Sequence, residues 1–157
     1  MIRTTKAADT PSLAALAEGT GVFKPAEIEA LREVFDEYYG QYQAQGHRCI
    51  VSEADGRRLG FAYYAVTSMT DRTWYLWWIA VDKRTQARGT GSELLRYVED
   101  DIRREKGRLV IIETSSLPHY EPTRRFYLKH GYEQGAVLRD FYADGDDMVV
   151  FRKRLAS

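Results

Sequence analysis

The spacing of apolar residues switches between helical and extended periodicity several times along the chain. Apolar residues three and four apart, as at Ile28, Leu31 and Phe35, are typical of a helix with one buried face. Alternating or continuous apolar runs bounded by Asp-Gly pairs are typical of strands joined by tight turns. In chain order the pattern predicts a strand at residues 1–5, helices at 10–19 and 24–40, strands at 49–52, 59–66 and 73–81, a helix at 90–106, a strand at 109–113, a helix at 122–130, and a hairpin of strands 137–142 and 148–153.

The longest apolar run, Trp74 to Val81, is apolar on both faces, as expected of a strand in the centre of a sheet. A helix and a second apolar strand follow it, and this order predicts a parallel crossover. The hairpins nearer the two ends predict antiparallel pairing. We therefore expect an α/β (α+β) fold, with a mixed parallel and antiparallel sheet of about six or seven strands flanked by about four helices. No linker interrupts the pattern, so residues 1–157 are expected to form a single domain.

Composition narrows the classes of function. A chain of 157 residues that is 44% hydrophobic can bury a stable core without disulfide or metal cross-links. Its one cysteine, Cys49, cannot form an intrachain disulfide. The three histidines lack metal-site spacing, so we expect no metal. Lys plus Arg and Asp plus Glu each number 23, which predicts neither a nucleic-acid nor a membrane partner. Without a signal peptide or a long apolar segment, a cytoplasmic protein is expected.

The most informative segment is the loop between the central strand and the next helix. It contains Gly89 and Gly91, and an amphipathic helix begins at these glycines. The first N–H groups of a helix have no intrahelical partner, and glycine lets an anion approach them, so the loop predicts a phosphate site beside the Arg88 cation. The alternative is that the glycines only permit a tight turn. The Walker pattern is absent, and the third glycine of a dinucleotide fingerprint is missing, which disfavours a general nucleotide-binding domain.

Two segments resemble one family. Gln86-Ala87-Arg88-Gly89-Thr90-Gly91 resembles the Q/R-x-x-G-x-G/A signature of the GNAT-type N-acetyltransferase superfamily, and the segment from Arg125 to Tyr132 resembles its second block, with Tyr132 in place of the usual Phe. The order of elements also matches, so the resemblance covers essentially the whole chain. It implies acetyl-coenzyme A (acetyl-CoA) as co-substrate, with pantetheine along the central strand and pyrophosphate in the loop. The implied cofactor-binding residues are Ile79, Ala80, Val81, Ala87, Arg88, Gly89, Thr90, Gly91 and Ser92.

The resemblance also implies a proton donor for the departing thiolate, and Tyr127 occupies the position of the family's tyrosine. The alternative is a tyrosine packed beside Phe126, and Tyr120 and Tyr132 are weaker substitutes. An amine arrives protonated, which calls for a base. Glu113, at the end of a predicted strand, is our candidate, against the alternative of a carboxylate that only caps the strand. His119, in the following loop, is a second candidate base. Cys49 is remote from the loop, so we expect direct acetyl transfer without a covalent enzyme intermediate.

No motif identifies the acceptor, which we expect to be a primary amine of a small molecule. The alternatives are a protein or peptide amine, and a non-catalytic module that binds acyl-CoA. Strand alternation sends Trp74 and Leu76 to one face and Tyr75 and Trp77 to the other, and one of these two pairs is expected to line the acceptor site. Tyr38 and Tyr39 are further candidates for that site. The acidic residues of the last hairpin are interpreted as turn residues and negative surface, with the alternative that they attract a cationic acceptor; they are Asp140, Asp144, Asp146 and Asp147. Two chains could pair through an edge strand or through the terminal hairpin, which leaves a homodimer open.

Overall fold

The computed structural model describes residues 1–155, apart from the side chains of Gln86 and Ala87. Within this range, seven strands form one mixed sheet in the order β1-β2-β3-β4-β5-β7-β6. The strands are β1 (Ile2–Thr4), β2 (Arg48–Ala54), β3 (Arg57–Val66), β4 (Thr73–Val81), β5 (Leu109–Ser115), β6 (Glu133–Ala143) and β7 (Asp146–Arg154). The longer helices are α1 (Thr10–Gly19), α2 (Pro25–Glu37), α3 (Thr90–Arg104) and α4 (Glu121–Lys129), with short turns η1 (Ala7–Asp9), η2 (Tyr38–Tyr42), η3 (Lys83–Arg88) and η4 (Pro118–Tyr120).

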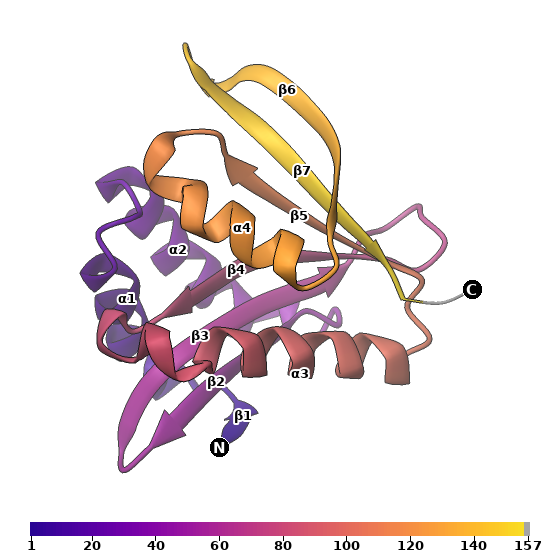
Figure 1. The fold of residues 1–157 in the computed structure, drawn as a ribbon. Coiled ribbons are helices and arrows are strands. Elements are labelled where there is room, and N and C mark those ends of the chain that lie inside the picture. Colours follow the sequence, from indigo (N-terminus) through magenta and orange to yellow (C-terminus); the bar gives the residue numbers. More distant parts are fainter. Residues whose placement is uncertain (156–157) are drawn as a thin grey trace.

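The helices cover both faces of the sheet, with α1 and α2 on one side and α3 and α4 on the other (Figure 1). One apolar cluster joins α3 and α4 to the sheet through residues such as Leu94 and Tyr127. A second cluster joins α1 and α2 to the opposite face through residues such as Leu31 and Phe35. The predicted mixed α/β fold is confirmed, and the strand predicted for the centre of the sheet, β4, is the fourth of the seven.

Strands β4 and β5 are parallel neighbours that pair over only three residues, from Thr73 opposite Leu109 to Tyr75 opposite Ile111. Beyond Tyr75, a bulge in β4 places Trp77 as an extra residue against β3, because Tyr64 faces Leu76 while Tyr63 faces Trp78. A bulge bends a strand and increases its twist. The remaining residues of β4 therefore pair with β3 alone, while β5 pairs along its whole length with β7. The two strands separate and leave a gap in the sheet.

Most predicted boundaries are confirmed within a few residues, and two segments differ in an informative way. The second helix was expected to end at Gly40, but α2 ends at Glu37 and the chain continues as the π-helical turn η2 through that glycine. The strands of the terminal hairpin are longer than expected. β6 forms an open edge of the sheet and is exposed along its whole length. The homodimer stays a prediction, and this edge is a surface through which two chains could pair. Among the described residues, no helix is long and apolar enough to cross a bilayer.

The end of α3 depends on two adjacent residues. Lys106 takes the left-handed conformation, with φ of 59°, and the N–H of Gly107 donates to the carbonyl of Ile102 at 2.8 Å. A Cβ atom added to Gly107 would lie 2.2 Å from Cγ2 of Ile102 and 2.9 Å from the Trp74 ring. Glycine is therefore required here for space rather than for an unusual φ, and this contact fixes where α3 ends against the sheet.

We predict that Gly107→Ala destabilises the protein by about 1–3 kcal/mol, because the added methyl group overpacks a closed site. At ~2–4 °C for each kcal/mol in a chain of this size, thermal unfolding should shift by several degrees. Gly19→Ala is the matched control, since a Cβ there meets nothing within 4 Å, and it should leave the melting temperature unchanged or slightly higher. Equal melting temperatures for the two variants would contradict the packing argument.

Candidate active site

The gap between β4 and β5 opens into a cleft of about 920 Å³ that reaches both faces of the sheet. On one side, which we name the α3–α4 half, the lining includes Ile79, Val81, Gly89, Gly91, Ser92, Ile112, Thr114, Thr123, Phe126, Tyr127 and Lys129. On the other side, the α1–α2 half, it includes Thr20, Val22, Phe23, Lys24, Glu27, Ala30, Trp77, Trp78, Glu113, Ser115, Tyr120, Tyr142 and Asp146. A ligand in the gap can therefore touch groups that the sheet would otherwise keep apart.

The free edge of β4 presents backbone groups to this cleft. The N–H of Asp82 donates to the carbonyl of Leu59 at 2.7 Å, so Asp82 faces β3, and the carbonyl of Ala80 also lies against β3 at Gly60. Successive residues of a strand point their backbone groups to opposite neighbours. Ile79 and Val81 therefore direct theirs into the gap, where β5 no longer pairs. These are two of the three strand residues expected at the cofactor site. The third, Ala80, also lines the cleft, although its side chain is mostly packed in the cluster beneath α1 and α2.

The N-terminus of α3 lies at the end of the same edge. Gly89, the N-cap residue, has φ of 81°, which favours glycine, and no side chain caps the helix. The first intrahelical bond runs from the N–H of Glu93 to the carbonyl of Gly89 at 3.0 Å, so the N–H groups of Thr90, Gly91 and Ser92 precede the helical ladder. With the helix dipole they form a site suited to an anion. Gly89, Gly91 and Ser92 line the cleft, as expected.

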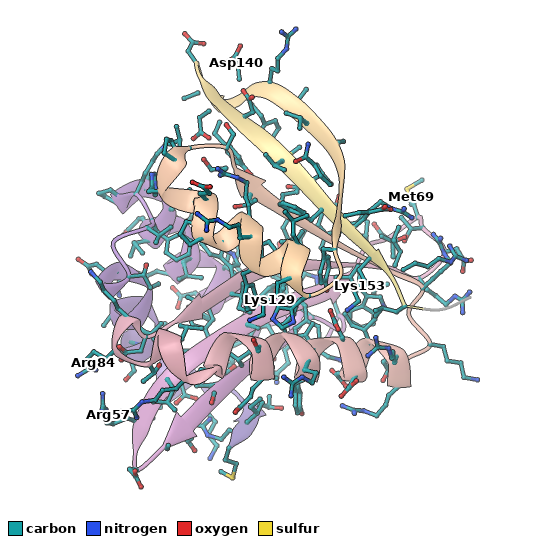
Figure 2. The ribbon with its side chains drawn as sticks, in the orientation of Figure 1. Arg57, Met69, Arg84, Lys129, Asp140 and Lys153 are labelled. Carbon is teal, nitrogen blue, oxygen red and sulfur yellow. The ribbon has the colours of Figure 1, made fainter. Side chains whose placement is uncertain are left out.

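Side chains around this helix end add polar groups. Ser92 Oγ lies 2.9 Å from Nε2 of His130, whose pKa is lowered because the ring is partly buried. Lys129 lines the cleft and extends from the end of α4 toward α3 (Figure 2). Arg88, expected to assist an anion, is exposed at the end of η3. The side chain of Ala87, also expected at the cofactor site, lies outside the described residues.

Tyr127 lies in the α3–α4 half, where α4 packs against the sheet. Its side chain is 3% exposed, and its ring packs against Phe151 and Tyr132 at centroid distances of 5.6 and 6.0 Å. Burial raises the pKa of Tyr127, which keeps its hydroxyl protonated at neutral pH. The tyrosine is thus both packed and in contact with the cleft, so the two interpretations of it are compatible.

Glu113 reaches the cleft from β5 on the opposite face of the sheet. Burial raises the pKa of its carboxyl, and a hydrogen bond with Tyr75 partly offsets this shift. A carboxyl with a raised pKa is a better proton acceptor than a solvated one. The gap in the sheet therefore brings the predicted acid, Tyr127, and the predicted base, Glu113, into one cavity from opposite faces.

The structure separates the other tyrosine candidates. Tyr120 lines the cleft, and its hydroxyl donates to the carbonyl of Val22 at 3.4 Å. Tyr132 does not line the cleft, because its hydroxyl donates to buried Glu99 at 2.7 Å. Tyr38 is a buried core residue.

The second candidate base, His119, and the cysteine expected to take no part, Cys49, lie outside the cleft, and the surface position predicted for Asp146 is wrong. His119 is exposed in η4, and Cys49 is fully buried in the core between the sheet and α1 and α2. Asp146, interpreted as a surface turn residue, is 4% exposed and lines the cleft. Its carboxylate accepts a hydrogen bond from Ser115 Oγ and lies 3.7 Å from Nζ of Lys24. Its place beside Ser115 follows from the pairing of β7 with β5, which the sequence does not show.

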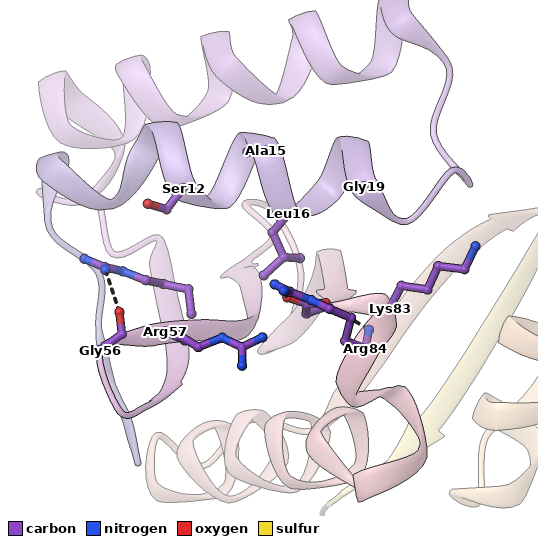
Figure 3. A pocket seen from close by; sticks show the side chains of 10 residues that line it. Ser12, Ala15, Leu16, Gly19, Gly56, Arg57, Lys83 and Arg84 are labelled. Atoms are coloured by element: carbon purple, nitrogen blue, oxygen red, sulfur yellow. Dashed lines mark hydrogen bonds and ion pairs between the residues drawn. The ribbon is translucent and has the colours of Figure 1, made fainter.

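A second hollow, of about 740 Å³, lies between α1, the β2–β3 turn and η3 (Figure 3). Its lining includes four basic residues, but two of them are paired with carboxylates: Arg58 with Asp9 and Arg84 with Asp82, each at 2.9 Å. None of the residues predicted for binding or catalysis lines this hollow. The cleft between β4 and β5 is therefore the candidate site.

Comparisons with known proteins identify relatives along most of the chain. A crystal structure of a protein from Desulfovibrio desulfuricans, assigned to the GNAT family as an acetyltransferase, superposes with a TM-score of 0.94 at 36% identity over 99% of both chains. An uncharacterized N-acetyltransferase of Methanocaldococcus jannaschii is 29% identical over 107 residues, which cover 66% of this chain and 64% of that protein. An aminoglycoside 6'-N-acetyltransferase complexed with coenzyme A shares the fold at a TM-score of 0.80 and 17% identity, over 100% of this chain and 98% of its own.

The family model for an acetyltransferase (GNAT) domain matches residues 45–134, more than half of the chain. The matched range runs from just before β2 to the start of β6, so it contains the gap between β4 and β5, the loop and α4. The family resemblance noted in the sequence is thereby confirmed: this chain belongs to the GNAT family of acetyltransferases.

Proposed function

We propose that this protein transfers the acetyl group of acetyl-CoA directly to the primary amine of a small molecule. The observation that carries the proposal is the gap between β4 and β5. It collects a free strand edge, an uncapped helix N-terminus, a buried tyrosine and a partly buried carboxylate in one cleft. The family uses acetyl-CoA, and these groups match the polar parts of that molecule.

The α3–α4 half suits the co-substrate. The N–H groups of Thr90, Gly91 and Ser92 would hold the pyrophosphate, with Lys129 nearby as a counter-charge. The backbone groups of Ile79 and Val81 would pair with the amides of pantetheine in the place that β5 vacates. A Cβ at Gly91 would only touch Phe126 at 3.4 Å and Val81 at 3.5 Å, so packing alone would tolerate alanine there, in agreement with the G/A of the signature.

The chemistry then needs three proton transfers. Glu113 takes a proton from the ammonium group, directly or through water, which frees the nitrogen lone pair to attack the thioester carbonyl. When the new C–N bond has formed and the C–S bond breaks, Tyr127 donates its hydroxyl proton to the departing sulfur. The second proton of the attacking nitrogen then passes, directly or through water, to the tyrosinate and restores the Tyr127 hydroxyl. The products are an acetamide and free coenzyme A. Cys49 is buried away from the cleft, so the acetyl group passes directly between the substrates.

Acetyl-CoA should stabilise the protein against heat, by about 2.7 kcal/mol at 100 times its dissociation constant. ATP and NAD at the same concentration should not produce a comparable shift in melting temperature.

Gly89→Ala imposes about 1–2 kcal/mol of backbone strain at the φ of 81° and displaces the N–H groups of the helix end. We expect this variant to bind acetyl-CoA at least tenfold more weakly.

Gly46→Ala is the control for this strain, because Gly46 has φ of 97° in an open turn that does not line the cleft. It should lose similar stability and bind acetyl-CoA like the wild type. If ATP or NAD stabilised the protein as strongly as acetyl-CoA does, the site would instead be a general nucleotide site.

Tyr127→Phe should lower kcat by about 100-fold or more, because general acid catalysis contributes ~10²–10⁴. Its dissociation constant for acetyl-CoA should be unchanged, since the ring stays packed. Tyr97→Phe is the control, because Tyr97 lies on α3 and does not line the cleft, and its kcat should change little. Measured turnover by release of coenzyme A distinguishes the two. If Tyr127→Phe kept the wild-type kcat, Tyr127 would be excluded as the general acid.

The acidic limb of the kcat/KM profile should report Glu113. The carboxylate is the active form, and burial raises its pKa, so activity should be lost as pH falls through a value above the ordinary ~4.3. Glu113→Gln should abolish this loss of activity at low pH and lower kcat/KM about 100-fold. The increase of kcat/KM at high pH, where the amine is itself deprotonated, should remain. Glu121→Gln, at an exposed carboxylate that pairs with Arg125, is the control. An unchanged profile in Glu113→Gln would exclude Glu113 as the base.

A further inference from the structure

The α1–α2 half of the cleft has walls of aromatic side chains. They come from segments far apart in the sequence and are Phe23, Trp77, Trp78, Tyr120 and Tyr142. Phe23 packs against Trp78 with ring centroids 5.6 Å apart, and Trp77 stacks on Tyr75 at 4.5 Å. Trp77 is nonetheless 48% exposed and Tyr142 is 42% exposed, so both retain surface that a ligand can cover. Such walls suit a flat or apolar body.

Three carboxylates share this half of the cleft: Glu27, Glu113 and Asp146. Lys24 is the one basic residue among the described residues of this half, and it lies beside Asp146. Three negative charges and one positive charge leave a formal charge of −2. Burial, together with the negative charges of these three carboxylates, raises the pKa of Tyr142 to about 12. The lining is therefore both aromatic and negative, a combination that attracts cations.

Two contacts tie together the segments around this half. The hydroxyl of Tyr120 donates to the carbonyl of Val22, which joins η4 to the loop between α1 and α2. The ion pair of Lys24 with Asp146 joins the same loop to β7. These bridges connect both sides of the α1–α2 half, which favours a compact ligand over an extended polypeptide.

We propose that the acceptor is a small organic cation, a protonated primary amine on a flat or apolar body without a carboxylate group. The inference rests on the proposed acetyl transfer, and it names the acceptor class for that site. A carboxylate beside the amine, as in an amino acid, would enter a region of charge −2 whose single cation is already paired. The aromatic walls would hold the body of the amine and interact with its positive charge.

The test compares tryptamine with tryptophan, which differ by one carboxylate group. With acetyl-CoA saturating, we expect kcat/KM for tryptamine to exceed that for tryptophan by about 100-fold, because a like charge is brought near uncompensated carboxylates. Butylamine, which lacks the flat body, should be about tenfold poorer than tryptamine. Trp77→Leu should remove most of the advantage of tryptamine over butylamine.

Glu27→Gln tests the charge without removing a structural bond. Oε1 of Glu27 accepts a hydrogen bond from the N–H of Lys24 at 2.9 Å, and the Gln oxygen can keep it. We expect this variant to narrow the preference for tryptamine over tryptophan three- to tenfold. Glu29→Gln is the matched control, because Glu29 is exposed on the same helix and does not line the cleft. It should leave the preference unchanged.

The outcomes separate this inference from the proposed function. Equal kcat/KM for tryptamine and tryptophan, or a preference for tryptophan, would overturn the inference and leave acetyl transfer standing. If acetyl-CoA bound but none of the amines were acetylated, the proposed function would fail. Binding would then decide the inference: in the presence of coenzyme A, tryptamine should raise the melting temperature and tryptophan should not, and the reverse would overturn it.

Discussion

The site depends on one interrupted interaction, the pairing of β4 with β5. These two parallel strands hold together for three residues and then separate, directly after Tyr75 and at the bulge that inserts Trp77. The extra residue shifts the alternation of β4, so that Ile79 and Val81 direct their backbone groups to the side that β5 has left. Without the separation, Tyr127 and Glu113 would lie on opposite faces of a closed sheet. With it, they share one cavity.

The gap is tolerated because the strands on either side of it are anchored independently. β4 pairs with β3 and β5 pairs with β7, and each face of the sheet has its own apolar cluster. Stability therefore comes from the two layers around the gap, which leaves the free β4 edge and the uncapped start of α3 with hydrogen-bonding capacity. A ligand with amides and phosphates, in that order along its length, would satisfy both, so binding would complete the hydrogen bonding of the sheet.

Much of the fold could be predicted from the sequence, because periodicity and turn residues are local signals. Asp55 and Gly56 have φ of 52° and 74°, as the predicted hairpin turn requires, and β4 has the predicted bounds. The π-helical turn through Gly40 was missed, since it depends on the packing of the tyrosines around it. In the site, the loop is a contiguous signal and its Gly89 and Gly91 line the cleft, whereas Asp146 was interpreted first as a surface turn residue and is buried. Its burial follows from the pairing of β7 with β5, and strand order is not a local property.

Under the proposed function, the two halves of the cleft would recognise their ligands by different means, and this explains which half the sequence reveals. The α3–α4 half relies on backbone groups of one continuous segment, so glycines at fixed spacing mark it. The α1–α2 half relies on side chains from several segments, brought together only by folding. Its charge of −2 is hidden in a chain whose net charge is zero. A substitution such as Glu27→Gln changes this half without touching the loop, so under this proposal the acceptor could vary while the co-substrate stayed the same.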